Sequence, residues 1–118
     1  MDARLAEAES RFADLIWSNE PLSSRTLAEL AEKELFWKKS TTYTVLKRLC
    51  QKGIFQNQDG TVTSLISKDA FIAMQSERFV EQTFSGSLPA FLAAFGSRKK
   101  LSDREVEELQ KIIESMRR

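Results

Sequence analysis

The chain has 118 residues, of which 42% are apolar and 30% are charged, and its formal net charge at pH 7 is +1. This length suits one modest core with an accessory element, and the composition excludes disordered and fibrous classes. The chain has no histidine, which excludes most nucleophile–base pairs and the commonest metal ligand. It has one cysteine, Cys50, which cannot form an internal disulfide. We therefore expect a protein that is not an enzyme and that holds no cofactor and no metal.

No apolar run approaches the roughly 20 residues that span a bilayer, so we predict no membrane insertion and a cytoplasmic location. The first helix is predicted from Leu5 to Asn19, because apolar side chains recur there at three- and four-residue steps. Ser23 or Ser24 can cap a second helix that buries Leu27, Leu30 and Ala31. Phe36 and Trp37 are predicted to form an aromatic corner before a third helix.

The segment from Leu35 to Gln58 contains no acid, although acids and bases nearly balance over the whole chain. On a helical wheel its helix separates an apolar side, with Val45, Leu46 and Leu49, from a side rich in bases and hydroxyls. Such a face suits the major groove of DNA. There the phosphates attract lysine and arginine side chains, and the edges of the nucleotide bases form hydrogen bonds with hydroxyls. The candidate DNA-binding residues are Lys38, Lys39, Ser40, Thr41, Tyr43, Thr44, Lys47 and Arg48.

Gly53 suits the left-handed conformation at the end of this helix, and Asp59-Gly60 lies between two short β-prone runs, 54–58 and 61–66. Asp-Gly in that position is the strongest local signal for a β-hairpin. Three helices followed by a hairpin indicate a winged helix-turn-helix, predicted over residues 1–67. Thr61, at the tip of this wing, joins the DNA-binding candidates.

Residues 68–118 are predicted to be helical, which makes the fold mainly α. Ser67 can cap a fourth helix, 85–87 breaks it, a short apolar helix runs from Leu88 to Phe95, and Ser102 with Glu105 forms a capping box for the last helix. These helices would expose a large apolar surface, so we expect a homodimer that buries it. The candidate dimer interface consists of Phe71, Phe79, Phe84, Phe91, Phe95, Val106, Leu109, Ile112, Ile113 and Met116.

Five segments in this order resemble the penicillinase-repressor family, the BlaI/MecI/CopY type of bacterial transcriptional repressors. They are LAEAESRFADLIW at 5–17, TTYTVLKRLCQKG at 41–53, LISKDAF at 65–71, FSGSLPAFLAAF at 84–95 and KLSDREVEELQKII at 100–113. The resemblance implies a winged helix that binds a palindromic operator of double-stranded DNA, and a helical dimerisation region over residues 68–118. It also implies a repressor of antibiotic-resistance or stress genes that is nucleoid-associated when bound.

In the resistance-type members of this family, a signal-activated membrane protease ends repression by cutting an Asn-Phe bond, which falls here at Ala94-Phe95. The copper-type members bind metal through cysteines near the C-terminus, whereas no cysteine follows Cys50 here. Family positions for operator contacts fall on Ser40, Thr41, Tyr43, Thr44, Lys47 and Arg48, and Tyr43 replaces a basic residue carried by some relatives.

Several alternatives remain open from the sequence. The lysines could form only a solvated helix face, Tyr43 could pack in the core or face the groove, and the stripe from Val106 to Met116 could serve intrachain packing or a foreign helix. A winged helix can also act as a protein-interaction adaptor without DNA binding. The acid-free interval favours the DNA-binding repressor, because an adaptor has no need of it.

Overall fold

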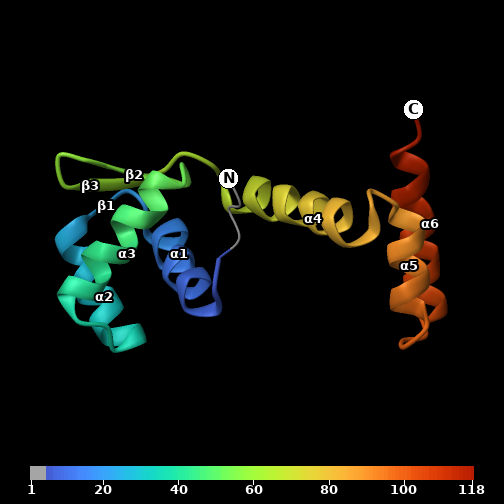
Figure 1. Cartoon of the computed structure of the whole chain (residues 1–118), viewed down its shortest axis with the longest axis horizontal. Helices are drawn as coiled ribbons and strands as arrows, with labels where there is room; N and C mark the ends of the chain where they lie inside the picture. The colour runs from blue at the N-terminus through green and yellow to red at the C-terminus, as the bar shows by residue number, and fades with distance from the viewer. Residues whose placement is uncertain (1–4) are drawn as a thin grey trace. The chain divides into compact units, whose positions relative to one another are not determined.

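The structure is a computed structural model that describes residues 5–118. The first of its two compact units ends at Ser76, and the second runs from Glu77 to Arg118. The elements are α1 (Glu7–Asn19), β1 (Leu22–Ser23), α2 (Ser24–Leu35), α3 (Lys39–Gln51), β2 (Phe55–Gln58), β3 (Thr61–Ser64), α4 (Lys68–Phe84), α5 (Leu88–Gly96) and α6 (Asp103–Ser115). The prediction of a winged helix followed by a helical region is confirmed (Figure 1). The boundary at residues 67 and 68 stays a prediction; α4 begins directly after it.

The sheet of the first unit has three antiparallel strands in the order β1–β3–β2. Asp59 (φ 52°) and Gly60 (φ 87°) form the predicted turn, and both have the positive φ that the central positions of a type I′ hairpin turn need. The second run was predicted to extend to Ile66, but β3 ends at Ser64. There the backbone N–H and the hydroxyl of Ser64 both donate to Glu20 Oε1, at 2.8 Å each.

β1 was not predicted, because two residues are too short to show a periodic pattern. Its Leu22 is opposite Val62 of β3, so this small strand covers the free edge of the hairpin and adds an apolar side chain to the core. Directly afterwards, the side chain of Ser23 caps α2 by accepting from the N–H of Thr26 at 3.0 Å.

The core of the first unit gathers apolar side chains from α1, α2, α3 and the sheet. Figure 1 shows the ribbons of these elements close together. The predicted division of α3 is confirmed: Thr42, Val45, Leu46 and Leu49 are buried. Thr42 is the one buried polar residue among those described, and its hydroxyl donates to the carbonyl of Lys38 at 3.4 Å. The fully buried side chains include Phe12, Ile16, Leu27, Phe55 and Val62.

Trp17 joins the start of α4 to this core. Its indole N–H donates to the carbonyl of Ile66 at 3.0 Å, and its ring contacts Phe55 and Phe71 at centroid distances of 5.1 and 5.6 Å. Lys68 Nζ lies 2.9 Å from a carboxylate oxygen of Asp14. Phe71 was predicted to lie in a dimer interface, but its side chain is only 4% exposed in this core, so it is not available to a partner.

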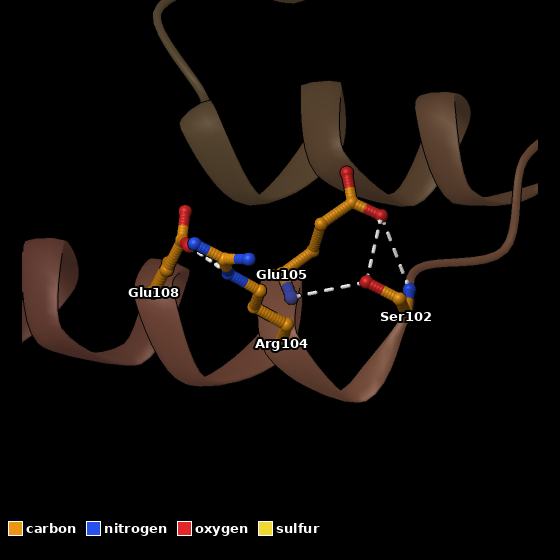
Figure 2. A network of polar contacts seen from close by, with 4 residues as sticks. All are labelled: Ser102, Arg104, Glu105 and Glu108. Carbon is orange, nitrogen blue, oxygen red and sulfur yellow. Dashed lines mark hydrogen bonds and ion pairs between the residues drawn. The ribbon is translucent and has the colours of Figure 1, made fainter.

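The second unit begins within α4. Ser85 and Gly86 take positive φ after Phe84, which ends α4, and Ser87 caps α5 by accepting from the N–H of Ala90 at 3.1 Å. The predicted capping box of α6 is confirmed and is shown in Figure 2: Ser102 Oγ accepts from the N–H of Glu105, whose carboxylate accepts from the N–H of Ser102. Beside it, Arg104 pairs with Glu108 at 3.1 Å.

Candidate nucleic-acid interface

The turn between α2 and α3 positions the candidate interface. Phe36 takes a left-handed conformation (φ 59°) at the end of α2, and α3 begins three residues later. Trp37 packs on Phe12 with ring centroids 5.0 Å apart, whereas the side chain of Phe36 is 89% exposed. The predicted aromatic corner is therefore wrong for Phe36, because the left-handed residue directs its side chain away from the core that Trp37 enters.

All the predicted α3 candidates lie on one exposed surface, which we call the α3 face. It consists of Lys38, Lys39, Ser40, Thr41, Tyr43, Thr44, Lys47 and Arg48. None of these residues is needed for the core, because the buried side of the same helix supplies Thr42, Val45, Leu46 and Leu49. Thr61 is also exposed, at the first position of β3, opposite Gln58 at the tip of the wing.

The α3 face is flanked by two shallow depressions. One, of about 230 Å³, is lined by Ser40, Thr41, Thr44, Val45 and Arg48. The other, of about 310 Å³, is lined by Tyr43, Leu46, Lys47, Cys50 and Asn57. The hydroxyls with Arg48 thus lie on one flank, and Tyr43 with Lys47 lies on the flank nearer the wing.

Asn57 of β2 is a candidate that the sequence reasoning missed. Its partner across the hairpin is Val62, and Asn57 itself is exposed on the flank of Tyr43 and Lys47. By the alternation of the strand, Asn57 shares the face of the buried Phe55, so the sequence pattern would have directed it toward the core. The packing of the hairpin beside α3 instead leaves it exposed next to that helix.

Cys50 is half-buried and lines the depression that Tyr43, Lys47 and Asn57 also line. Burial raises the pKa of its thiol, against a smaller opposite effect of the backbone hydrogen bond with Asn57. The raised pKa favours the neutral thiol at physiological pH, which is a poor nucleophile and a poor metal ligand. Within residues 5–118, no group of three or more histidine, cysteine, aspartate or glutamate side chains is placed to hold a metal ion.

Arg48 has a partner that the acid-free interval does not reveal. Its Nη1 lies 2.9 Å from Oε2 of Glu9, a residue of the first turn of α1. Burial alone would raise the pKa of Glu9. The hydrogen bonds from Arg48 and from the backbone of Ala6, with the charges of Lys52 and Arg48, outweigh it and hold the pKa below its ordinary value.

This lowered pKa predicts an acid-sensitive contribution to stability. A carboxylate with a lower pKa in the folded state stabilises the fold fully above its unfolded-state pKa, and the contribution is lost as pH falls through the folded-state pKa. We expect Glu9→Gln to lower the free energy of unfolding at neutral pH by about 1 kcal/mol or less, because Arg48 is half exposed. The difference from the wild type should vanish in acid. Denaturant unfolding across that pH range measures it, and an undiminished difference in acid would contradict the assignment.

The second unit carries an apolar groove of about 560 Å³ between α5 and α6, which we call the α5–α6 groove. Phe91, Leu92 and Phe95 line it from α5, and Val106, Leu109, Ile112 and Ile113 line it from α6. No residue of either helix is buried, although both carry many apolar side chains. None of the helices within residues 5–118 has both the length and the apolar composition of a membrane-spanning segment.

Comparison with known proteins covers almost the whole chain. Residues 5–115 match the penicillinase repressor family. The chain is 26% identical to the penicillinase repressor of Bacillus licheniformis over 115 residues. This alignment covers 94% of this chain and 90% of that protein. It is 26% identical over 113 residues to the methicillin resistance regulatory protein MecI of Staphylococcus aureus, which covers 92% of each chain. Because the family match extends from α1 to α6, this chain belongs to the penicillinase repressor family.

Proposed function

We propose that this protein is a transcriptional repressor that binds an inverted-repeat operator as a homodimer and controls antibiotic-resistance genes. The observation that carries the proposal is the α3 face. It presents exposed basic and hydroxyl side chains along the second helix of a helix-turn-helix, α3, which follows the turn after α2. Membership of the repressor family supports it. The protein would repress by occupying the promoter, which requires no catalysis.

The residues of the α3 face divide into two roles. Lys38, Lys39 and Lys47 supply positive charge to phosphates, which gives affinity without sequence information. Ser40, Thr41 and Thr44, on the first half of the helix, are short enough for α3 to approach base edges closely. The first half of such a helix enters the major groove most deeply. Tyr43 and Thr61 complete the proposed contact surface.

The homodimer is proposed from the second unit. Its aromatic side chains touch one another in a chain from Phe79 through Phe84 and Phe91 to Phe95, yet Phe79 and Phe95 remain about half exposed. The stripe on α6 and the α5–α6 groove add further open apolar surface. A second copy would cover all of it at once, in an interface on the order of 2,000 Å² or more. The proposed interface residues are Phe79, Phe84, Phe91, Phe95, Val106, Leu109, Ile112, Ile113 and Met116.

We further propose that a signal-activated membrane protease relieves repression by cutting Ala94-Phe95. This bond lies in the exposed last turn of α5, where Ser97 Oγ donates to the carbonyl of Ala94 at 2.7 Å. A protease needs an extended chain, and helix ends open more readily than helix interiors. Local opening of one turn would therefore present the bond.

Selection of bound fragments from random duplex DNA tests the proposed function, followed by titration of the selected operator at several salt concentrations. We expect an inverted repeat to be enriched. Lys47→Ala should reduce the slope of log K against log salt by about 0.9 per protomer and weaken all sequences alike. Thr44→Ala should instead change the preferred base at one position in each half-site.

The two variants serve as matched controls for each other, because Thr44 and Lys47 are exposed on the same helix. If both weakened specific and random DNA equally, the division of roles would be wrong. Absence of any DNA enrichment would favour the protein-interaction adaptor, which would use the α5–α6 groove to hold a partner.

A further inference from the structure

Arg48 differs from the lysines of the α3 face because it forms an ion pair with an acidic residue, Glu9. Within the described part of the chain, no ion pair is found for Lys38, Lys39 or Lys47, whereas Arg48 Nη1 lies 2.9 Å from Glu9 Oε2. The pair joins residues far apart in the sequence, from the first turn of α1 to the second half of α3. An acid therefore reaches a surface whose own sequence contains none.

Glu9 is the fixed member of this pair. Its side chain is 13% exposed, against 51% for Arg48. Its second oxygen, Oε1, accepts from the backbone N–H of Ala6 at 3.3 Å, so both carboxylate oxygens are engaged and the group cannot rotate freely. Arg48 has five N–H donors in a planar fork, and those not directed at Glu9 remain available on its exposed side.

The place of Arg48 on the α3 face suits a positioned contact. It lines the same depression as Ser40, Thr41 and Thr44, the hydroxyls proposed to face base edges. Thr44 precedes Arg48 by one helical turn. A phosphate that Arg48 contacts would therefore lie close to the nucleotide bases that Thr44 faces. The Glu9 carboxylate also interacts with the positive charge of Lys52, besides its hydrogen bond with Arg48.

We infer that Glu9 is a specificity-determining residue of the DNA-binding surface, acting through Arg48 and without touching DNA. This inference rests on the proposed operator binding. The carboxylate holds the guanidinium of Arg48 in one orientation. Arg48 then favours only the register of the protein on DNA in which a phosphate contacts the N–H donors that are not directed at Glu9. It also cancels the charge of Arg48 toward DNA in general, which lowers affinity for random sequence. Glu9 thereby raises the ratio of specific to non-specific binding.

Glu9→Gln in the full-length protein tests this role, because it keeps the size of the side chain but removes the negative charge that holds and neutralises Arg48. We expect tighter binding to a random duplex, and a salt slope steeper by about 0.9 per protomer as Arg48 becomes free to meet phosphates. The ratio of affinities for selected operator and random duplex should fall about fivefold or more, comparable to one mismatched base pair.

Glu7→Gln is the matched control, since it removes an exposed carboxylate from the same first turn of α1. It should leave both the slope and the ratio close to those of the wild type. Arg48→Lys is the second test variant: it keeps the charge but loses the planar fork, so the ratio should fall here too. This variant decides the matter if Glu9→Gln does not fold, which circular dichroism would reveal.

The outcomes separate this inference from the proposed function. If the wild type shows no preference for any DNA sequence, the proposed function fails. If the wild type is selective but Glu9→Gln behaves like Glu7→Gln, or Arg48→Lys keeps the full ratio, the positioning role of Glu9 is overturned. Loss of the Glu9→Gln effect in an Arg48→Ala background would support it, because the effect would then depend on Arg48.

Discussion

Leu109→Asp is expected to convert the proposed dimer into monomers and to weaken operator binding by about 10²- to 10⁴-fold. Leu109 is the half-buried residue in the middle of the α6 stripe, and it lines the α5–α6 groove. A carboxylate there would have to be desolvated in an apolar interface without a partner, which strongly disfavours association. Two tethered half-site contacts would then become two weak independent ones.

Sedimentation at micromolar protein and operator titration measure this result together. Lys111→Asp is the matched control, because it places the same side chain on the exposed, polar side of α6 and should remain dimeric. Circular dichroism should show that both variants keep their helices, since no residue of α6 is fully buried in the unit. A wild-type protein that sediments as a monomer would contradict the proposed interface.

Cleavage after Ala94 is expected to have an effect of similar size. The cut would remove the end of α5 and the whole of α6, and with them Leu109 and the α6 side of the groove. The first unit would keep its core, its wing and the complete α3 face, because these all precede Ser76. Each fragment would retain a half-site contact but lose the effective-concentration advantage of about 10² to 10⁴.

Mass spectrometry of the native protein from cells exposed to a cell-wall antibiotic tests this mechanism. A fragment ending at Ala94 should appear as repression is relieved. Cells left untreated provide the control and should contain the intact chain. Intact chain in fully derepressed cells would rule out proteolysis and would direct attention to a ligand site between the protomers.

Local patterns were sufficient to predict most elements of this fold. Asp59-Gly60 predicted the hairpin because few residue pairs tolerate positive φ at both turn positions. Ser102 and Glu105 predicted the start of α6 because their reciprocal hydrogen bonds involve only neighbours in the chain. The two sides of α3 followed from the helical period, and the structure buries the predicted apolar side. In each case the interactions that determine the conformation lie within a few residues.

Interactions between distant segments could not be predicted in this way. In the sequence, Phe71 had the same apolar pattern as the other phenylalanines. In the structure its ring packs against Trp17 and is buried in the core of the first unit. β1 forms by pairing with the hairpin, Leu22 with Val62 and Ser23 with Thr61. Asn57 reaches the α3 face through the packing of the wing.

The electrostatics of the α3 face show the same division. The sequence alone determined that this helix carries bases and hydroxyls without a nearby acid, because charge along a segment is a property of its residues. Glu9 lies far from Arg48 in the chain, and only the packing of α1 against the remainder of the first unit brings its carboxylate within 2.9 Å of the guanidinium. Coulombic interaction depends on distance in space, so the state of Arg48 could be established only from the folded structure.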